Sequence, residues 1–148
     1  MNKRRVVITG LGAATPLGDS VDILWDSLLK GRSGVSNIES FDVSQFPVRF
    51  AGEIKDFDIS KYVDVREGRR MDRFTQLAVA SAVNAMTDSG LDMAQVDLDR
   101  CGVIVGSGIG GIQEIEQQHI RLLNKGLARF RRSQCLNLWA TQPAELFQ

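Results

Sequence analysis

The chain opens with an apolar strand that runs directly into a glycine-rich loop, and this unit restricts the possible folds more than any other stretch. The run Val6–Ile8 consists of β-branched residues without polar alternation. Such a run favours a strand buried on both faces, as in a parallel sheet. Gly10, Gly12, Pro16 and Gly18 then predict a loop whose backbone turns sharply or approaches a neighbour closely. We therefore expect a strand–loop–helix unit of an α/β protein.

A glycine loop between a strand and a helix can also bind a dinucleotide, with the pyrophosphate at the N-terminus of the helix. Here Thr15 stands where that fingerprint needs its third glycine, and Pro16 follows it. No second short strand ending in an acidic residue comes at the required distance. A dinucleotide-binding domain is therefore the least favoured function.

Two helices are predicted from caps and periodicity. Asp19 and Ser20 are suitable N-cap residues for a helix that ends near Lys30, with an apolar stripe that would pack on the sheet. The stripe consists of Val21, Leu24, Trp25, Leu28 and Leu29. The longest helix is expected from Met71 to about Ser89, with Gly90 as its C-terminal cap. Its face of small residues, among them Ser81, Ala82 and Ala85, indicates a deeply buried helix.

The stretch between these helices has no clear period. We expect loops with short strands around Val48–Phe50 and at Ala51-Gly52. The scattered aromatic side chains are interpreted as core residues beneath a long loop, in preference to a ligand cage. They are Phe41, Phe46, Phe50 and Phe57.

A second buried strand is predicted at Cys101–Val105, and it leads into the glycine-rich loop Gly106–Gly111 and a further helix. Asp97 and Asp99, just before the strand, are interpreted as solvated loop charges and not as paired catalytic carboxylates. His119, the only histidine, falls on the apolar face of the helix. We expect it to be a packed core residue, neither a base nor a ligand.

Three of these stretches carry a family resemblance. They are Arg4–Gly18, the helix that begins Met71-Asp72-Arg73-Phe74 and ends Asp88-Ser89-Gly90-Leu91, and the loop Gly106–Gly111. Together they resemble the β-ketoacyl-acyl carrier protein synthases of fatty-acid synthesis, most closely the synthase II type. The resemblance implies a partial thiolase-like α/β fold, an incomplete N-terminal half in which helices cover a buried mixed sheet. It also implies an acyltransferase reaction. An acyl chain moves from acyl carrier protein to a cysteine, and malonyl-acyl carrier protein is decarboxylated and joined to it.

The resemblance also implies roles for particular residues. Ile109 would line the end of the acyl pocket of the partner subunit in a homodimer. Arg66, Arg69 and Arg70 would help to dock the acidic acyl carrier protein, because guanidinium groups suit carboxylate partners. Without the resemblance, a solvated surface is the better interpretation of this basic run. No cofactor and no metal site are expected.

The resemblance stops at Gly126. We therefore divide the chain into a truncated synthase domain, residues 1–126, and an aberrant tail, residues 127–148. The codons for Phe130–Ser133 can be written so that a shifted reading frame encodes Ser-Pro-Phe. The family has a Ser-Pro-Phe segment near this place. Our hypothesis is therefore that a frameshift produced the tail. The family's nucleophilic cysteine, its two catalytic histidines and its lysine would lie beyond Gly126. No catalytic residue is assigned, and the chain alone is expected to be inactive. The alternative function is a non-catalytic module that docks acyl carrier protein or an intact synthase subunit.

Composition narrows the remaining choices. The 148 residues contain 18 basic and 18 acidic side chains, so no net field favours nucleic acid or an anionic membrane. There is no apolar run of membrane-spanning length and no signal peptide. Cys101 and Cys135 lack metal-binding or CxxC spacing, which favours a cytoplasmic protein with reduced thiols.

Overall fold

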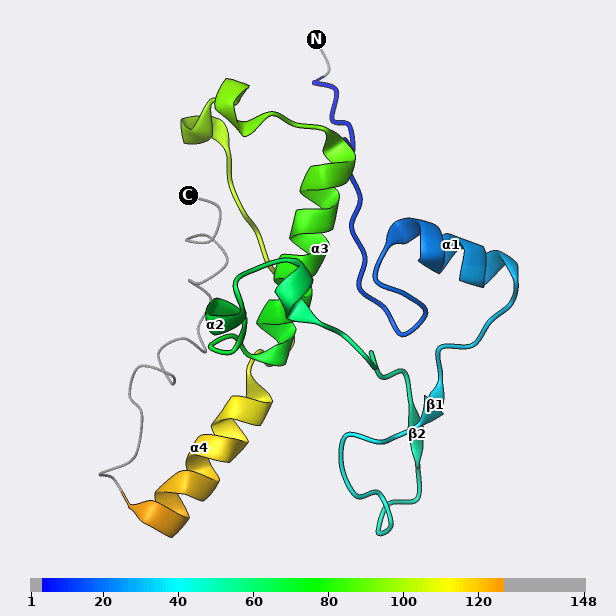
Figure 1. Ribbon diagram of the computed structural model, residues 1–148, viewed down its shortest axis with the longest axis vertical. Coiled ribbons are helices and arrows are strands. Elements are labelled where there is room, and N and C mark those ends of the chain that lie inside the picture. The colour runs from blue at the N-terminus through cyan, green and yellow to red at the C-terminus, as the bar shows by residue number, and fades with distance from the viewer. Residues whose placement is uncertain (1–3, 127–148) are drawn as a thin grey trace. The chain divides into compact units, whose positions relative to one another are not determined.

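The computed structural model describes residues 4–126, and its helices and strands are shown in Figure 1. In chain order they are α1 (Val21–Leu29), β1 (Ser36–Asn37), β2 (Phe50–Ala51), α2 (Val65–Gly68), α3 (Arg73–Ser89) and α4 (Ile112–Lys125), with short 3-10 turns at Ile59–Lys61, Met93–Gln95 and Leu98–Arg100. The described residues form two compact units, 4–58 with 80–94 and 59–79 with 95–126. The predicted tail, residues 127–148, lies outside the described residues and stays a prediction.

In the first unit, α1 forms where its caps predict. The Ser20 hydroxyl accepts a hydrogen bond from the amide of Ile23 at 3.3 Å, and Gly31 takes a left-handed conformation (φ 63°) after the last turn. The predicted burial of the apolar stripe is wrong. Trp25 and Leu29 are exposed, and the buried residue of this helix is Ser27. A stripe can be buried only against a surface, and the expected sheet is not formed beside it.

The second half of α3 and the N-terminal segment lie side by side in this unit (Figure 1). A Cβ atom on Gly12 would lie 1.9 Å from the carbonyl oxygen of Ser81, and one on Gly10 would lie 2.2 Å from that of Ala85. The amide of Leu11 donates a 2.8 Å hydrogen bond to Oδ2 of Asp88. The small-residue face of α3 is thus the surface that the glycine loop approaches.

The predicted strand Val6–Ile8 is not paired. No hydrogen bond of its backbone is found within residues 4–126, and Val6 and Ile8 are 93% and 82% exposed. The sheet that the described residues do form is small and antiparallel, with Ser36 opposite Ala51 and Asn37 opposite Phe50. Only β2 falls where short strands were predicted, around Val48–Phe50 and at Ala51-Gly52, and β1 was not predicted. A strand acquires its structure from its neighbours, and the described part of this unit supplies none for Val6–Ile8.

The aromatic residues of the long loop are not core residues, which corrects the prediction. Phe41 and Phe46 form an edge-to-face pair with ring centroids 5.8 Å apart, but both rings are about half exposed, as is Phe50. Phe57 is partly buried. The pair shields the rings from water only in part, because the loop has no sheet beneath it.

In the second unit, α2 and the first half of α3 are linked by side-chain and backbone contacts. The amide group of Gln76 donates a 2.9 Å hydrogen bond from Nε2 to the carbonyl oxygen of Gly68. Helix α3 begins at Arg73, two residues later than predicted, and ends at Ser89 with Gly90 at φ 61°. Its buried residues are Val79 and Ala80 at the centre and Thr75 near the start, so the predicted deep burial holds for only part of the helix.

Cys101–Val105 is also unpaired, which corrects the second predicted strand. Ile104 is 99% exposed, and no backbone hydrogen bond of Val103–Val105 is found in the described part of the chain. Helix α4 forms as predicted, but Ile115, Leu123 and His119 are exposed on it. His119 is therefore not the packed core residue that was expected. None of the helices among residues 4–126 is long and apolar enough to cross a membrane.

Candidate functional site

The three arginines predicted to dock a partner are carried by α2 and the residues just after it. The Asp64 side chain caps this helix by accepting a 2.7 Å hydrogen bond from the amide of Arg66. Gly68 is buried, and a Cβ atom there would lie 2.7 Å from Cγ2 of Ile59. The turn is therefore fixed both by its cap and by close packing on its inner side.

Arg66, Arg69 and Arg70 are all exposed on this turn. Arg66 lies within α2, Arg69 is the C-cap residue of this helix and Arg70 follows it, so the three side chains fall within five consecutive residues. Among the described residues, none of their guanidinium groups forms an ion pair or a side-chain hydrogen bond. Glu67 is the single acidic residue within the turn. The result is a small, positively charged surface with unengaged donors, which we call the arginine face.

Ile109 lies in the same unit, on the loop that precedes α4. Gly110 has φ 76° and donates a 2.9 Å hydrogen bond from its amide to the hydroxyl oxygen of Ser107. The Ile109 side chain is 72% exposed. A Cβ atom on Gly106 or Gly108 would meet nothing within 4 Å. The structure therefore shows an exposed apolar tip, and no contact with the arginine face is present in the described residues.

The titratable and nucleophilic side chains of the described part do not assemble into a catalytic group. Cys101 is exposed, and its thiol contacts the carbonyl oxygen of Asp97 at 3.4 Å. The Asp97 carboxylate accepts a hydrogen bond from the amide of Asp99, and both acidic residues are exposed, as predicted. Within residues 4–126, no group of three or more His, Cys, Asp or Glu side chains is placed to hold a metal ion.

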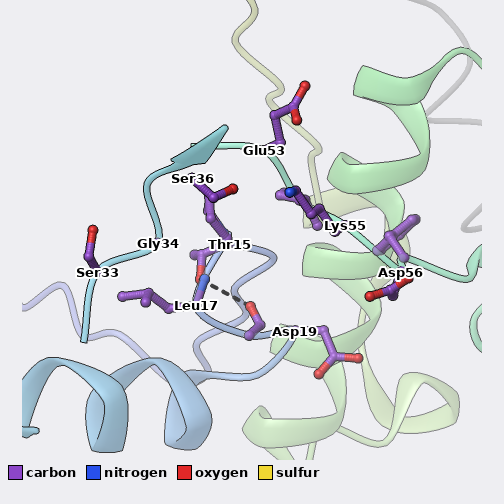
Figure 2. Close-up of a pocket in the computed structure, with 13 residues that line it drawn as sticks. Thr15, Leu17, Asp19, Ser33, Gly34, Ser36, Glu53, Lys55 and Asp56 are labelled. Atoms are coloured by element: carbon purple, nitrogen blue, oxygen red, sulfur yellow. Dashed lines mark hydrogen bonds between the residues drawn. The ribbon is translucent and has the colours of Figure 1, made fainter. Parts of the chain in front are cut away.

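A pocket of about 330 Å³, which the sequence did not indicate, lies in the first unit (Figure 2). Its wall is formed by the Thr15–Gly18 turn, Ser33-Gly34, Ser36 and residues 53–57. The turn is closed by paired backbone hydrogen bonds between Thr15 and Gly18. Asp56 lies in the left-handed region at φ 53°. Aspartate adopts this conformation more readily than most residues do. The sequence alone did not indicate it at Asp56.

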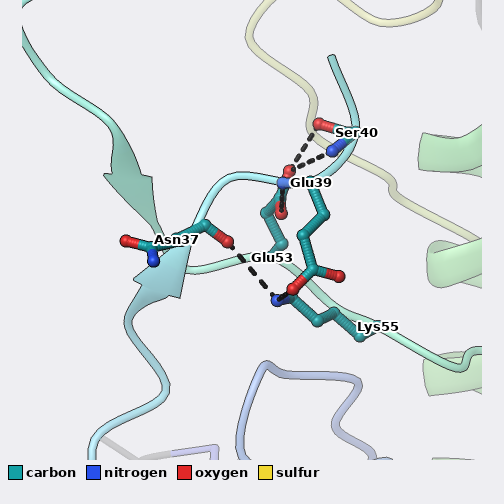
Figure 3. A network of polar contacts seen from close by, with 5 residues as sticks. All are labelled: Asn37, Glu39, Ser40, Glu53 and Lys55. Carbon is teal, nitrogen blue, oxygen red and sulfur yellow. Dashed lines mark hydrogen bonds and ion pairs between the residues drawn. The ribbon is translucent and has the colours of Figure 1, made fainter. Parts of the chain in front are cut away.

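One wall of this pocket is held by a polar network (Figure 3). Lys55 Nζ lies 2.5 Å from Oε1 of Glu39 and 3.4 Å from the carbonyl oxygen of Asn37. The Glu53 carboxylate accepts hydrogen bonds from the Ser40 hydroxyl and from the amide of Glu39. The Ser40 hydroxyl, followed by that amide, lowers the pKa of Glu53 below its usual range. The network joins the end of β1 and the residues just after it to the segment that follows β2, and it engages the charges of Glu53 and Lys55.

Comparison with known proteins agrees with the resemblance seen in the sequence. The profile of the family described as "Beta-ketoacyl synthase, N-terminal domain" matches residues 3–137. A 3-oxoacyl-[acyl-carrier-protein] synthase 2 of Vibrio harveyi is 47% identical over 126 residues, which are 85% of this chain and 30% of that protein. A relative of the same name from a Synechocystis species is 43% identical over 129 residues, 87% of this chain and 31% of that protein.

Solved structures give the same result for the fold. The crystal structure of a β-ketoacyl synthase from Burkholderia phymatum superposes with a TM-score of 0.71 at 28% identity, and covers 92% of this chain and 34% of that one. A type II polyketide ketosynthase solved in complex with its acyl carrier protein superposes with a TM-score of 0.64 at 27% identity over 85% of this chain and 32% of that one.

The partial thiolase-like α/β fold is thereby confirmed, and the chain spans about 30% of the length of the curated relatives it matches. The chain belongs to the β-ketoacyl synthase family, and its residues 3–137 match the family's N-terminal domain.

Proposed function

We propose that this chain is the N-terminal part of a fatty-acid-elongating β-ketoacyl-acyl carrier protein synthase, and that its own contribution is a docking surface for acyl carrier protein. The observation that carries the proposal is the arginine face, three exposed guanidinium groups on one anchored turn without partners among the described residues. Relatives named 3-oxoacyl-[acyl-carrier-protein] synthase 2 support the substrate class.

The chemistry of the surface suits an acidic protein. Guanidinium groups form paired hydrogen bonds with carboxylates, and an exposed cluster of them mainly accelerates encounter and sets orientation. Because the side chains are solvated before binding, each contact contributes modestly and is weakened by salt. Docking through Arg66, Arg69 and Arg70 should therefore be fast, salt-sensitive and of moderate affinity.

A titration of the chain with acyl carrier protein tests this proposal. Replacing all three arginines with glutamate is expected to weaken binding by roughly tenfold or more, and raising the salt concentration should weaken the unmodified chain in the same direction. The matched control is Arg32→Glu, which reverses an exposed charge in the first unit, outside the arginine face. Since none of these exposed side chains forms an ion pair or a side-chain hydrogen bond among residues 4–126, all variants should give the circular dichroism spectrum of the unmodified chain. Equal affinity of the triple variant and the unmodified chain would refute docking through this surface.

In the complete enzyme, the proposal assigns Ile109 to the end of the acyl pocket of the partner subunit in a homodimer. The exposed position of this side chain on a short loop supports an intermolecular contact. The chain itself is proposed to be cytoplasmic and not to condense acyl groups alone, because the family's nucleophilic cysteine is expected beyond Gly126. A direct assay for carbon dioxide released from malonyl-acyl carrier protein tests the last point, and release above the protein-free rate would contradict it.

A further inference from the structure

The segment that carries two of the three residues of the arginine face is held on both sides by one side chain. The two residues, Arg69 and Arg70, directly follow α2. On either side of this pair, the carbonyl oxygens of Gly68 and Met71 accept hydrogen bonds of 2.9 Å and 3.3 Å from Nε2 of Gln76. A side-chain amide nitrogen carries two protons, so a single group can donate both bonds. The Gln76 side chain therefore connects α3 to both ends of the arginine pair.

The backbone hydrogen bonds of the pair itself run back to α2. The amide of Arg69 donates to the carbonyl oxygen of Val65 at 3.1 Å, and the amide of Arg70 donates to that of Glu67 at 2.9 Å. Both bonds lie within one helical turn, so they determine the local shape of the turn and not its direction relative to α3. Without Gln76 the turn would keep its shape and lose a connection that orients it.

The chemistry of Gln76 suits such a role. Its side chain is partly buried, and a hydrogen bond withdrawn from water is stronger than the same bond on an open surface. The side chain carries no charge, so it does not alter the positive field of the arginine face. Its effect on an acidic partner should therefore come from the direction of the guanidinium groups and not from added attraction.

We propose that Gln76 is a positioning residue for carrier-protein docking, which holds the backbone on both sides of Arg69 and Arg70 and so directs their guanidinium groups. The inference rests on the proposed docking function. A prearranged side chain loses less conformational freedom on binding, because its backbone is already ordered in the free protein. Arg66 should depend less on Gln76, since it lies within α2 and its amide is bonded to the Asp64 side chain at 2.7 Å.

Gln76→Met tests the proposal in the full chain. Methionine is unbranched, is compatible with a helix and donates no hydrogen bond. In the titration with acyl carrier protein, this variant should bind about three- to tenfold more weakly than the unmodified chain. The salt dependence of the affinity should be unchanged, because all three arginines remain.

Thr87→Val is the matched control for the loss of a side-chain hydrogen bond on the same helix. The Thr87 hydroxyl lies in the last turn of α3 and donates a 2.9 Å hydrogen bond to the carbonyl oxygen of Val83. The residue is exposed and lies far along the helix from Gln76. Its replacement should leave the affinity for acyl carrier protein within about twofold.

A comparison of double variants separates positioning from stability. In a chain with Arg69→Gln and Arg70→Gln, Gln76→Met should have almost no further effect on affinity, because the side chains through which it acts are absent. In a chain with Arg66→Gln, the loss caused by Gln76→Met should persist. A substitution that only destabilised the chain would weaken binding equally in both backgrounds.

Hydrogen exchange gives a second measurement that does not need the carrier protein. The backbone amides of Arg70 and Met71 should exchange about tenfold faster in Gln76→Met than in the unmodified chain. The amides of Val79 and Ala80, at the buried centre of α3, should exchange at their original rates. This pattern would locate the change at the turn that carries the arginine pair.

The outcomes distinguish this proposal from the docking proposal. If the triple glutamate variant is impaired and Gln76→Met binds normally, the positioning role is overturned and docking stands. If the triple glutamate variant binds normally, docking through the arginine face is refuted and the positioning role fails with it. Faster exchange throughout α3, or a loss of affinity that persists without Arg69 and Arg70, would give Gln76 a structural role alone and would also overturn the proposal.

Discussion

The contact between the glycine loop and α3 can be tested by adding one methyl group at Gly12. The Cβ atom of an alanine there would lie 1.9 Å from the carbonyl oxygen of Ser81 and 2.7 Å from the amide nitrogen of Ala85. Both are helix backbone atoms and cannot rotate away. The loop must therefore move from the helix by about 1.5 Å to restore an ordinary contact distance.

The magnitude follows from what this movement breaks. Overpacking of a close contact costs about 1–3 kcal/mol in general. The same movement stretches the hydrogen bond from the amide of Leu11 to Asp88, a contribution of about 0.5–1.5 kcal/mol that is at the low end here because the site is exposed. Backbone strain does not contribute, since Gly12 is not among the glycines with positive φ. We expect Gly12→Ala to lower the free energy of unfolding of the first unit by about 1.5–3.5 kcal/mol.

Urea denaturation followed by far-ultraviolet circular dichroism and by tryptophan fluorescence measures this change. The matched control is Gly106→Ala, where an added Cβ atom meets nothing within 4 Å and φ is not positive. That variant should be unchanged or slightly more stable, because alanine restricts the unfolded chain. If Gly12→Ala and Gly106→Ala have the same unfolding midpoint as the unmodified chain, the close approach to α3 does not exist in solution.

Further predictions concern the caps and the polar network of the first unit. Ser20→Ala removes the N-cap of α1 and should cost about 1 kcal/mol in urea denaturation, whereas Ser20→Asp should retain the stability. Asn84→Ala removes the 2.8 Å hydrogen bond to the carbonyl oxygen of Asp19 and should cost about 0.5–1.5 kcal/mol, with an unchanged midpoint as the contrary result. Ser40→Ala should raise the pKa of Glu53 towards its ordinary value in an NMR titration of the carboxyl group. Because the pKa of Glu53 is lowered in the folded state, this residue stabilises the fold at pH values above its ordinary pKa. That stabilisation is lost as the pH falls through the folded-state pKa. Ser40→Ala should weaken this dependence of stability on pH.

Local sequence signals determined the elements whose stability is local. The cap at Ser20, the helix that ends at Ser89 with Gly90, and the helix after Gly111 are each present within two residues of the predicted position. Helices satisfy their own backbone hydrogen bonds, so caps and periodicity are sufficient to place them. The motifs that carry the family resemblance could also be identified from the sequence, because each is a short continuous segment. The exposure of the arginine face followed from its charge.

Tertiary structure decided burial and the use of the strands. Val6–Ile8 and Cys101–Val105 have the composition of buried strands and lie exposed, because pairing partners and covering faces are non-local and the described residues do not supply them. The exposed His119 has the same cause. Conversely, the small-residue face of α3 could be predicted to pack closely, but only the structure identified the glycine loop as its partner. The sequence thus determines which segments can be strands or helices, whereas the surroundings of each segment determine whether it is buried.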